Sequence, residues 1–205
     1  MMVMARSDAT NLELRGGHPA VDLVNTVAWR GDPRRRTDYL SDYLDLVAWA
    51  HHAEVLSSRE ANVLAERAAS AREAAAQTLR RTRHVREALH GIWTERESTR
   101  DADTVAAAFR SALRVKRLAV GVDVVEWQDS ALLLQSPLHR LAIEAVNLLT
   151  AVPRSRIKRC ADDECGWLFL DSSRRQNRRW CSTADCGNRA RVRNFYERGR
   201  EGLGS

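Results

Sequence analysis

The sequence predicts a mainly α-helical protein with one β-hairpin, in which a helical N-terminal domain precedes a small cysteine-rich module. Apolar residues recur at helical spacing over most of the first 150 positions, and one stretch after Leu118 is rich in β-branched residues. All four cysteines of the 205-residue chain fall near its C-terminus. We place the domain boundary at Pro153, which ends a helix, and expect domains of 1–153 and 154–205 in an α+β fold.

Several helices of the first domain are predicted by their start signals. Pro19 suits the first position of a helix. The segment Ser57–Glu60 has the residues of a capping box, in which each end of the segment bonds the backbone of the other. Residues 58–97 are rich in Ala, Arg and Glu and are predicted to be helical with a break near Ser70. A later helix is expected to begin at Ser136.

Between these helices lie one more predicted helix and a stretch with a strand pattern. Residues 104–117 predict a helix capped by Asp101 or Asp103. Residues 119–127 are β-branched and roughly alternating, which predicts a strand, and residues 131–134 could form the returning strand. We therefore expect a β-hairpin whose turn follows position 127.

The charge of the chain is unevenly placed. Residues 1–153 carry 20 Lys+Arg and 20 Asp+Glu, whereas residues 154–205 carry 13 Lys+Arg and 7 Asp+Glu. A basic module joined to a neutral one indicates a polyanion partner for the basic module. The sequence has no long apolar run and no apolar leader, so we expect a cytoplasmic protein without a membrane partner. It has no recognisable catalytic motif, and we expect no enzyme activity.

The cysteines have the spacing C-x4-C-x15-C-x4-C, which is typical of a structural zinc site. Gly166 and Gly187 follow the second cysteine of each pair, where a tight turn or a positive φ is needed. Two disulfides are disfavoured without a secretory signal, and four unrelated buried thiols would not share one short window. We therefore predict one structural Zn²⁺ bound by Cys160, Cys165, Cys181 and Cys186.

A basic helix is predicted after the third cysteine, because Ser182 and Asp185 form a helix-start signal. Val192 and Phe195 on this helix can pack inward. Arginine can recognise guanine and phosphate, and asparagine can recognise adenine. The candidate nucleic-acid contacts are Arg178, Arg179, Asn188, Arg189, Arg191 and Arg193.

The roles of Asn188 and Arg189 stay open at this point. Arg189 could contact DNA, could bond a zinc-bound sulfur, or could pair with Asp171, and Asn188 could cap a turn.

Four polar residues cluster within residues 18–26, at the start of the first predicted helix and along it. They could line a pocket for a small-molecule effector, or they could be buried polar groups with partners inside the fold. These residues are His18, Asp22, Asn25 and Thr26.

At this point two families become recognisable. Cys165–Asp171, Arg178–Ser182 and Cys186–Arg189 closely resemble the CGNR zinc finger, and Gly17–Thr26 resembles the opening motif of the ABATE domain. The resemblance implies a bacterial, stress-linked transcription regulator whose finger is a DNA-binding element. All four cysteines match the metal positions of the finger family.

We therefore expect a zinc-finger transcription regulator that binds DNA and responds to stress or to a ligand. The alternative is a zinc-stabilised module that binds protein or RNA and no duplex DNA; a third reading is a small-molecule enzyme. A homodimer is plausible because one finger has a small footprint on DNA.

Overall fold

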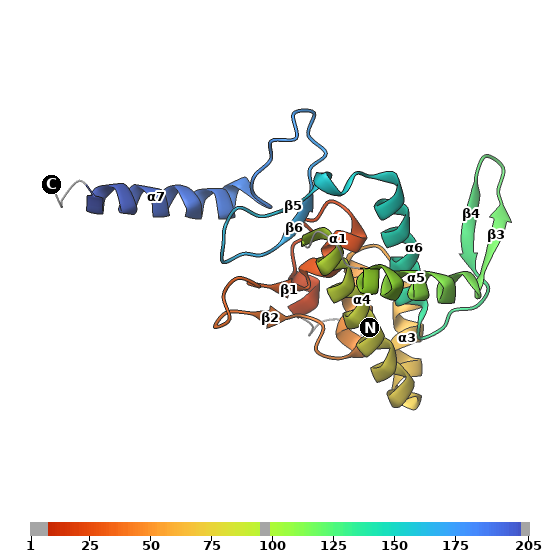
Figure 1. The fold of residues 1–205 in the computed structure, drawn as a ribbon. Coiled ribbons are helices and arrows are strands. Elements are labelled where there is room, and N and C mark those ends of the chain that lie inside the picture. The colour runs from red at the N-terminus through yellow and green to blue at the C-terminus, as the bar shows by residue number, and fades with distance from the viewer. Residues whose placement is uncertain (1–7, 95–98, 202–205) are drawn as a thin grey trace.

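A computed structural model describes residues 8–94 and 99–201 of the chain. Helices dominate these residues, and short antiparallel strand pairs join them (Figure 1). The α-helices of the described residues are α1 (Pro19–Asn25), α2 (Tyr43–His52), α3 (Ser58–Ser70), α4 (Arg72–Thr94), α5 (Thr99–Leu113), α6 (Ser136–Ala151) and α7 (Asn188–Glu201).

The core lies among the first six helices. Helix α5 packs on both α4 and α6, and α1 contacts α4 and α6. Trp49 of α2, Leu89 of α4 and Leu141 of α6 are fully buried and belong to one continuous apolar cluster. Burial of each such side chain stabilises the folded state by about 1.5–3 kcal/mol. Packing therefore holds this domain together more than helix propensity does.

The helix starts predicted for α1, α3 and α6 are confirmed. Pro19 opens α1, and His18 is its N-cap. The capping box of Ser57 and Glu60 precedes α3 with both of its reciprocal bonds present. Helix α3 ends at Ser70 and α4 begins two residues later, and α6 begins at Ser136.

The predicted bounds of the fifth helix are wrong. Helix α5 begins at Thr99, five residues earlier than expected, and ends at Leu113. Asp101 therefore lies within the first turn of α5 and is not its N-cap. At this position its carboxylate interacts favourably with the positive end of the helix dipole. A helical segment was predicted over residues 58–97, and its last three residues, 95–97, lie outside the described residues.

The β-hairpin is present, but its turn is not where the sequence pattern put it. Strand β3 (Lys116–Val120) pairs with β4 (Val125–Asp129), so residues 119–127 contain the turn and residues 131–134 are not a strand. Gly121 donates its N–H to the Val124 carbonyl at 2.8 Å and closes the turn. The run of β-branched residues hid this turn because Val122 and Val124 have strand propensity. The hairpin projects from the helical body (Figure 1).

The other two strand pairs are short. Strand β1 (Val27–Ala28) pairs with β2 (Thr37–Asp38), and β5 (Ile157–Arg159) pairs with β6 (Leu168–Leu170). Successive residues of β6 serve different cores: Leu168 belongs to the large helical cluster, while Phe169 packs with the four cysteines. The C-terminal module is thus continuous with the helical body, and α7 extends away from it (Figure 1).

A span across a membrane is not indicated. Within residues 8–94 and 99–201, no helix has both the length and the hydropathy that crossing a bilayer requires.

Candidate zinc centre and its surroundings

The four predicted cysteine ligands lie together. All four are buried, and their sulfur atoms lie within 4.8 Å of one another. The Sγ atom of Cys181 is 3.7 Å from that of Cys165 and 3.5 Å from that of Cys186. A tetrahedral zinc ion with bonds of about 2.3 Å places its sulfurs about 3.8 Å apart, so the cluster fits one zinc ion. The same separations far exceed the roughly 2.05 Å of a disulfide bond.

Backbone turns bring the first cysteine pair into position. Cys160 follows β5 directly, and its N–H donates to the Trp167 carbonyl at 2.8 Å. Gly166 has a φ of +69°, in the region that favours glycine, as its place after Cys165 predicted. A Cβ at Gly166 would lie 2.7 Å from the Cβ of Arg30, so the helical domain approaches too closely for any side chain there.

The second cysteine pair is held by a capped turn. Ser182 accepts a hydrogen bond from the Asp185 N–H at 3.2 Å and begins a single π turn over Thr183–Gly187, which carries Cys186. A Cβ at Gly187 would lie 3.3 Å from the ring of Trp180, which packs against the cysteine cluster. Gly187 therefore serves close packing alone, whereas Gly166 serves both a positive φ and close packing.

Arg189 supports the zinc centre. Its guanidinium donates to Oδ2 of Asp162 through two nitrogens, at 2.9 and 2.7 Å, and Nη2 also donates to the Cys186 sulfur at 2.9 Å. Four thiolates around Zn²⁺ carry a net charge of about −2, which a neighbouring guanidinium partly neutralises. The same guanidinium lies 5.0 Å from the ring centre of Trp29 in the helical domain. Of the alternatives weighed for Arg189, the bond to a cysteine sulfur is present, whereas Asp171 accepts a bond from Lys158 at 2.7 Å instead.

Asp162 receives a second arginine. Arg193, one turn after Arg189 on α7, donates to Oδ1 of Asp162 at 2.9 Å. The Asp162 side chain is fully buried, and burial alone would raise its pKa. The hydrogen bonds from Arg193 and Arg189 outweigh burial and hold the pKa below its ordinary value, so the carboxylate is charged. This pairing fixes the first turns of α7 against the zinc module.

The remaining candidate nucleic-acid contacts divide into two groups. Arg178 bonds the carbonyls of Trp180 and Cys181, at 3.0 and 2.6 Å, and its guanidinium lies 4.3 Å from the Phe169 ring centre. The Arg178 side chain therefore makes these contacts within the zinc module. The other three side chains are exposed to solvent: Arg179, Asn188 and Arg191.

Helix α7 does not bury its apolar residues. Val192 and Phe195, which could have packed inward, are 47% and 71% exposed, and Tyr196 is 66% exposed. The face that meets the module is charged, because Arg189 and Arg193 turn toward Asp162. Since successive residues advance about 100° around a helix, Arg191 lies on the face opposite this pair.

The polar residues of α1 have partners within the fold. The Nδ1 atom of His18 accepts from the Ala20 N–H at 3.2 Å, and Asp22 accepts from the Gly16 N–H at 2.7 Å. Burial raises the pKa of Asp22 to about 6 against the opposing effect of that hydrogen bond. Both side chains therefore already serve the start of α1.

The other two polar residues, Asn25 and Thr26, also bond partners outside α1. Asn25 bonds both backbone groups of Leu168 in β6, each at 2.9 Å. Thr26 donates to the Leu23 carbonyl at 2.7 Å and accepts from Arg86 at 3.1 Å. These contacts match the alternative reading, in which the group is buried polar structure.

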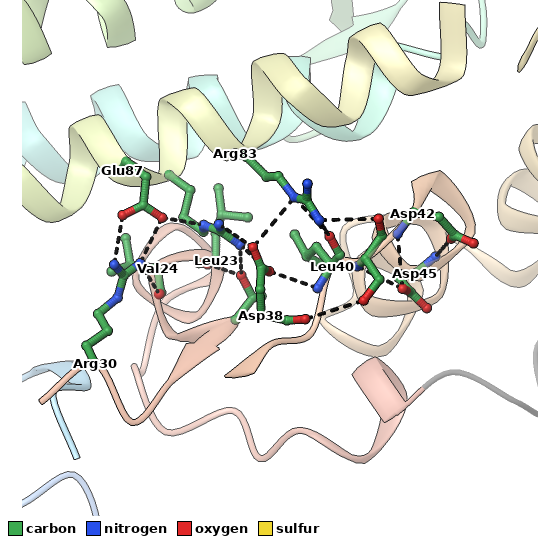
Figure 2. Close-up of polar contacts among 12 residues, drawn as sticks. Leu23, Val24, Arg30, Asp38, Leu40, Asp42, Asp45, Arg83 and Glu87 are labelled. Atoms are coloured by element: carbon green, nitrogen blue, oxygen red, sulfur yellow. Dashed lines mark hydrogen bonds and ion pairs between the residues drawn. The ribbon is translucent and has the colours of Figure 1, made fainter. Parts of the chain in front are cut away.

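A polar network of the helical domain holds the segment that faces the zinc module. Buried Arg86 of α4 bonds both oxygens of Asp38 in β2, at 2.7 and 2.8 Å. Glu87 bonds Arg30 at 2.7 and 3.1 Å, and Arg83 reaches the Leu40 carbonyl at 2.9 Å (Figure 2). The network thus ties the segment that carries Trp29 and Arg30 to the long helix α4.

A cavity lies where the two parts meet. Its volume is about 500 Å³, and Trp29 and Tyr39 from the helical domain line it together with Trp167, Cys165 and Arg189 from the zinc module. Small-molecule sites commonly have volumes of about 300–1,000 Å³.

Sequence reasoning missed two residues of the site. Asp162, the anchor for two arginines, lies between the first two cysteines, and its signal was an acidic residue inside the most basic segment. Trp29 is in contact with the guanidinium groups of Arg35 and Arg189, which lie 3.3 and 5.0 Å from its ring centre, and nothing local in the sequence marks it.

The comparison with protein families covers both parts of the chain. Residues 17–152 match the ABATE family, described as "Putative stress-induced transcription regulator", and residues 156–199 match the CGNR zinc finger. A search of curated proteins finds no match. Both expected resemblances are confirmed in the expected order. The chain therefore belongs to the ABATE family and carries a CGNR zinc finger that can hold one zinc ion.

Proposed function

We propose that this protein is a sequence-specific DNA-binding regulator of transcription, acting in the bacterial cytoplasm, and that α7 enters the DNA groove. The observation that carries the proposal is the division of labour on α7. Arg189 and Arg193 bind the first turns of α7 to the zinc module, while Asn188 and Arg191 in the same turns stay exposed to solvent, and the helix extends away from the body (Figure 1). A rigidly mounted helix with free polar side chains is what groove recognition requires.

Phosphate contacts come from arginines outside α7. Arg174 and Arg175 in the loop after β6 are exposed, as is Arg179. Such contacts position a protein on the duplex and make its affinity fall steeply as salt rises. In this proposal residues 154–205 bind DNA, and residues 1–153 serve sensing or dimerisation.

The zinc ion acts structurally in this proposal. It supplies the cross-link that folds the short module, while four protein ligands leave it no open coordination position. The residues that would hold it are the four cysteines, and Arg189 would neutralise part of the charge of the centre. We propose no enzyme activity.

A ligand-responsive role is supported by the cavity between the two parts. A molecule bound there would contact both Trp29 and Arg189, and so would contact an arginine that fixes α7. Such a ligand would bias the position of α7 and thereby the affinity for DNA.

Selection of bound duplexes from a random pool by the full-length, zinc-loaded protein tests the proposal. We expect enrichment of a motif, and we expect Arg191→Ala to abolish the enrichment while the zinc content stays at one ion per chain. Arg59→Ala, an exposed arginine on α3, is the matched control and should leave selection unchanged. Failure to enrich any motif, with zinc bound, would refute duplex recognition.

A second function has its own supporting observation. Phe195 and Tyr196 are exposed on α7, and exposed aromatic rings can stack on unpaired bases or dock on a protein. Selection from a random RNA pool separates this reading from the first. Enrichment of RNA that is lost in Tyr196→Ala would favour it.

A further inference from the structure

The β3–β4 hairpin has one apolar face that stays largely open to solvent among the described residues. In the strand register, Leu118 lies opposite Trp127, and Val120 lies opposite Val125. Because side chains alternate across a strand, these four share one face of the ribbon, named here the apolar hairpin face. Their exposed fractions are 58%, 46%, 82% and 60% in the order given.

The opposite face of the ribbon is different in character. Arg117 lies opposite Gln128, and Ala119 lies opposite Glu126. Soluble ribbons place their polar residues outward and their apolar residues against a core. Here the apolar residues project into solvent, so the pattern indicates a missing partner.

The base of the hairpin is firmly anchored. Lys116 and Asp129 face each other across the two strands, with side chains 4% and 8% exposed and an N–O distance of 2.6 Å. Arg140 of α6 donates to the same aspartate at 2.8 Å. The ribbon is therefore presented in a defined direction, although a two-stranded ribbon alone is only marginally stable in water.

We propose that the apolar hairpin face binds the same face of a second copy of this chain, related by a two-fold axis. The exposed apolar area of the hairpin is close to what a stable dimer interface needs. With Val122 and Val124 of the turn, 100% and 64% exposed, the exposed apolar side chains amount to roughly 500 Å². A stable interface buries about 800 Å² per partner, of which about 60% is apolar.

The charges also favour a second copy. The apolar hairpin face beyond the Lys116–Asp129 pair has no charged residue, so two copies can meet there without repulsion. Residues 118–127 carry Asp123 and Glu126 and no basic residue, which disfavours an anionic lipid surface. The hairpin and α7 lie at opposite ends of the molecule, so this dimer leaves both α7 helices free (Figure 1).

Sedimentation velocity of the full-length, zinc-loaded protein without nucleic acid tests this inference, which does not depend on DNA binding. We expect a dimer with twice the 23.2 kDa chain mass at micromolar concentration. Val120→Lys should weaken the dimer by about 100-fold or more, because the two-fold axis buries the new charge twice.

Ala119→Lys is the matched control, since it puts the same charge one residue away on the polar face, opposite Glu126. We expect the dissociation constant of its dimer to lie within about threefold of that of the unchanged protein. Circular dichroism and zinc content check that both variants fold. A monomeric unchanged protein would overturn the inference, as would a dimer that Val120→Lys leaves intact. A monomer that floats with neutral phosphatidylcholine vesicles would assign the face to lipid and overturn it as well.

Discussion

The side-chain amide of Asn25 in α1 acts as a strand partner for Leu168 in β6. Its Nδ2 donates to the Leu168 carbonyl, and its Oδ1 accepts from the Leu168 N–H, both at 2.9 Å and both buried. The two residues are separated by 143 positions and come from the two parts of the chain that match different families. The amide thus satisfies both backbone groups of Leu168, as a neighbouring strand otherwise would, while the Leu170 N–H of β6 donates to the Gly16 carbonyl.

Asn25→Ala removes both of these bonds and leaves two buried backbone groups without partners. We expect the free energy of unfolding to fall by about 2–4 kcal/mol, measured by urea denaturation. Asn147→Ala on the exposed side of α6 is the matched control and should change it by less than about 0.5 kcal/mol. Equal effects of the two variants would contradict a structural role for Asn25.

Asp22→Asn should stabilise the protein at neutral pH. Burial raises the pKa of this carboxyl to about 6 in the folded state, above its ordinary value of 3.8. The folded state therefore binds more protons than the unfolded state, and the contribution of Asp22 to stability is lost as pH rises from about 4 through 6.

The asparagine variant has no such loss and can still accept from the Gly16 N–H. We expect it to gain about 1–3 kcal/mol at pH 7.5 and to lose this advantage below pH 4. Unfolding curves over this pH range, with exposed Asp103→Asn as control, measure the effect. A variant less stable than the unchanged protein at pH 7.5 would refute it.

Arg189→Ala should weaken zinc binding by about 10–100-fold, because it removes the donor to the Cys186 sulfur and leaves buried Asp162 with one arginine. Competition with a chelating dye measures the affinity. Arg191→Ala, on the opposite face of the same helix, should bind zinc as the unchanged protein does. If both variants bound zinc equally well, Arg189 would have no supporting role.

Arg86→Ala should cost about 2–4 kcal/mol of unfolding free energy. The Arg86 side chain is 4% exposed and bonds both oxygens of Asp38, which is 34% exposed and keeps part of its hydration. Arg80, six residues earlier on α4, pairs with Glu73 at the surface with 60% exposure. Arg80→Ala should cost less than about 0.5 kcal/mol in the same thermal or urea experiment, and a similar cost for both would contradict this account.

Features that rest on neighbouring residues could be predicted from the sequence. The capping box at Ser57 and Glu60 needs only three residues of spacing, and the cysteine pairs have chemistry that leaves few alternatives. Gly166 was predictable for the same reason, since the turn after a cysteine ligand determines its φ.

Features that rest on distant partners could not be predicted. The partner of Asn25 lies in another family segment, and a local pattern gives no information on such a contact. The apolar residues of α7 could have packed inward by periodicity, yet the helix turns its arginines toward the module because buried Asp162 attracts them. The hairpin turn was misplaced because valine favours strands even where it occupies a turn.

Strand β6 carries a consequence for the lifetime of the protein. Leu168 supports the helical core while Phe169, beside it, packs on the cysteines, so the state of the metal centre and the folding of the helices are thermodynamically linked. We therefore expect a chain that loses its ion to loosen Leu168 and the Asn25 contact to it. Proteases degrade open chains faster than closed ones, so we expect metal supply to affect the lifetime of each molecule. Zinc would then influence the abundance of this protein as well as its shape.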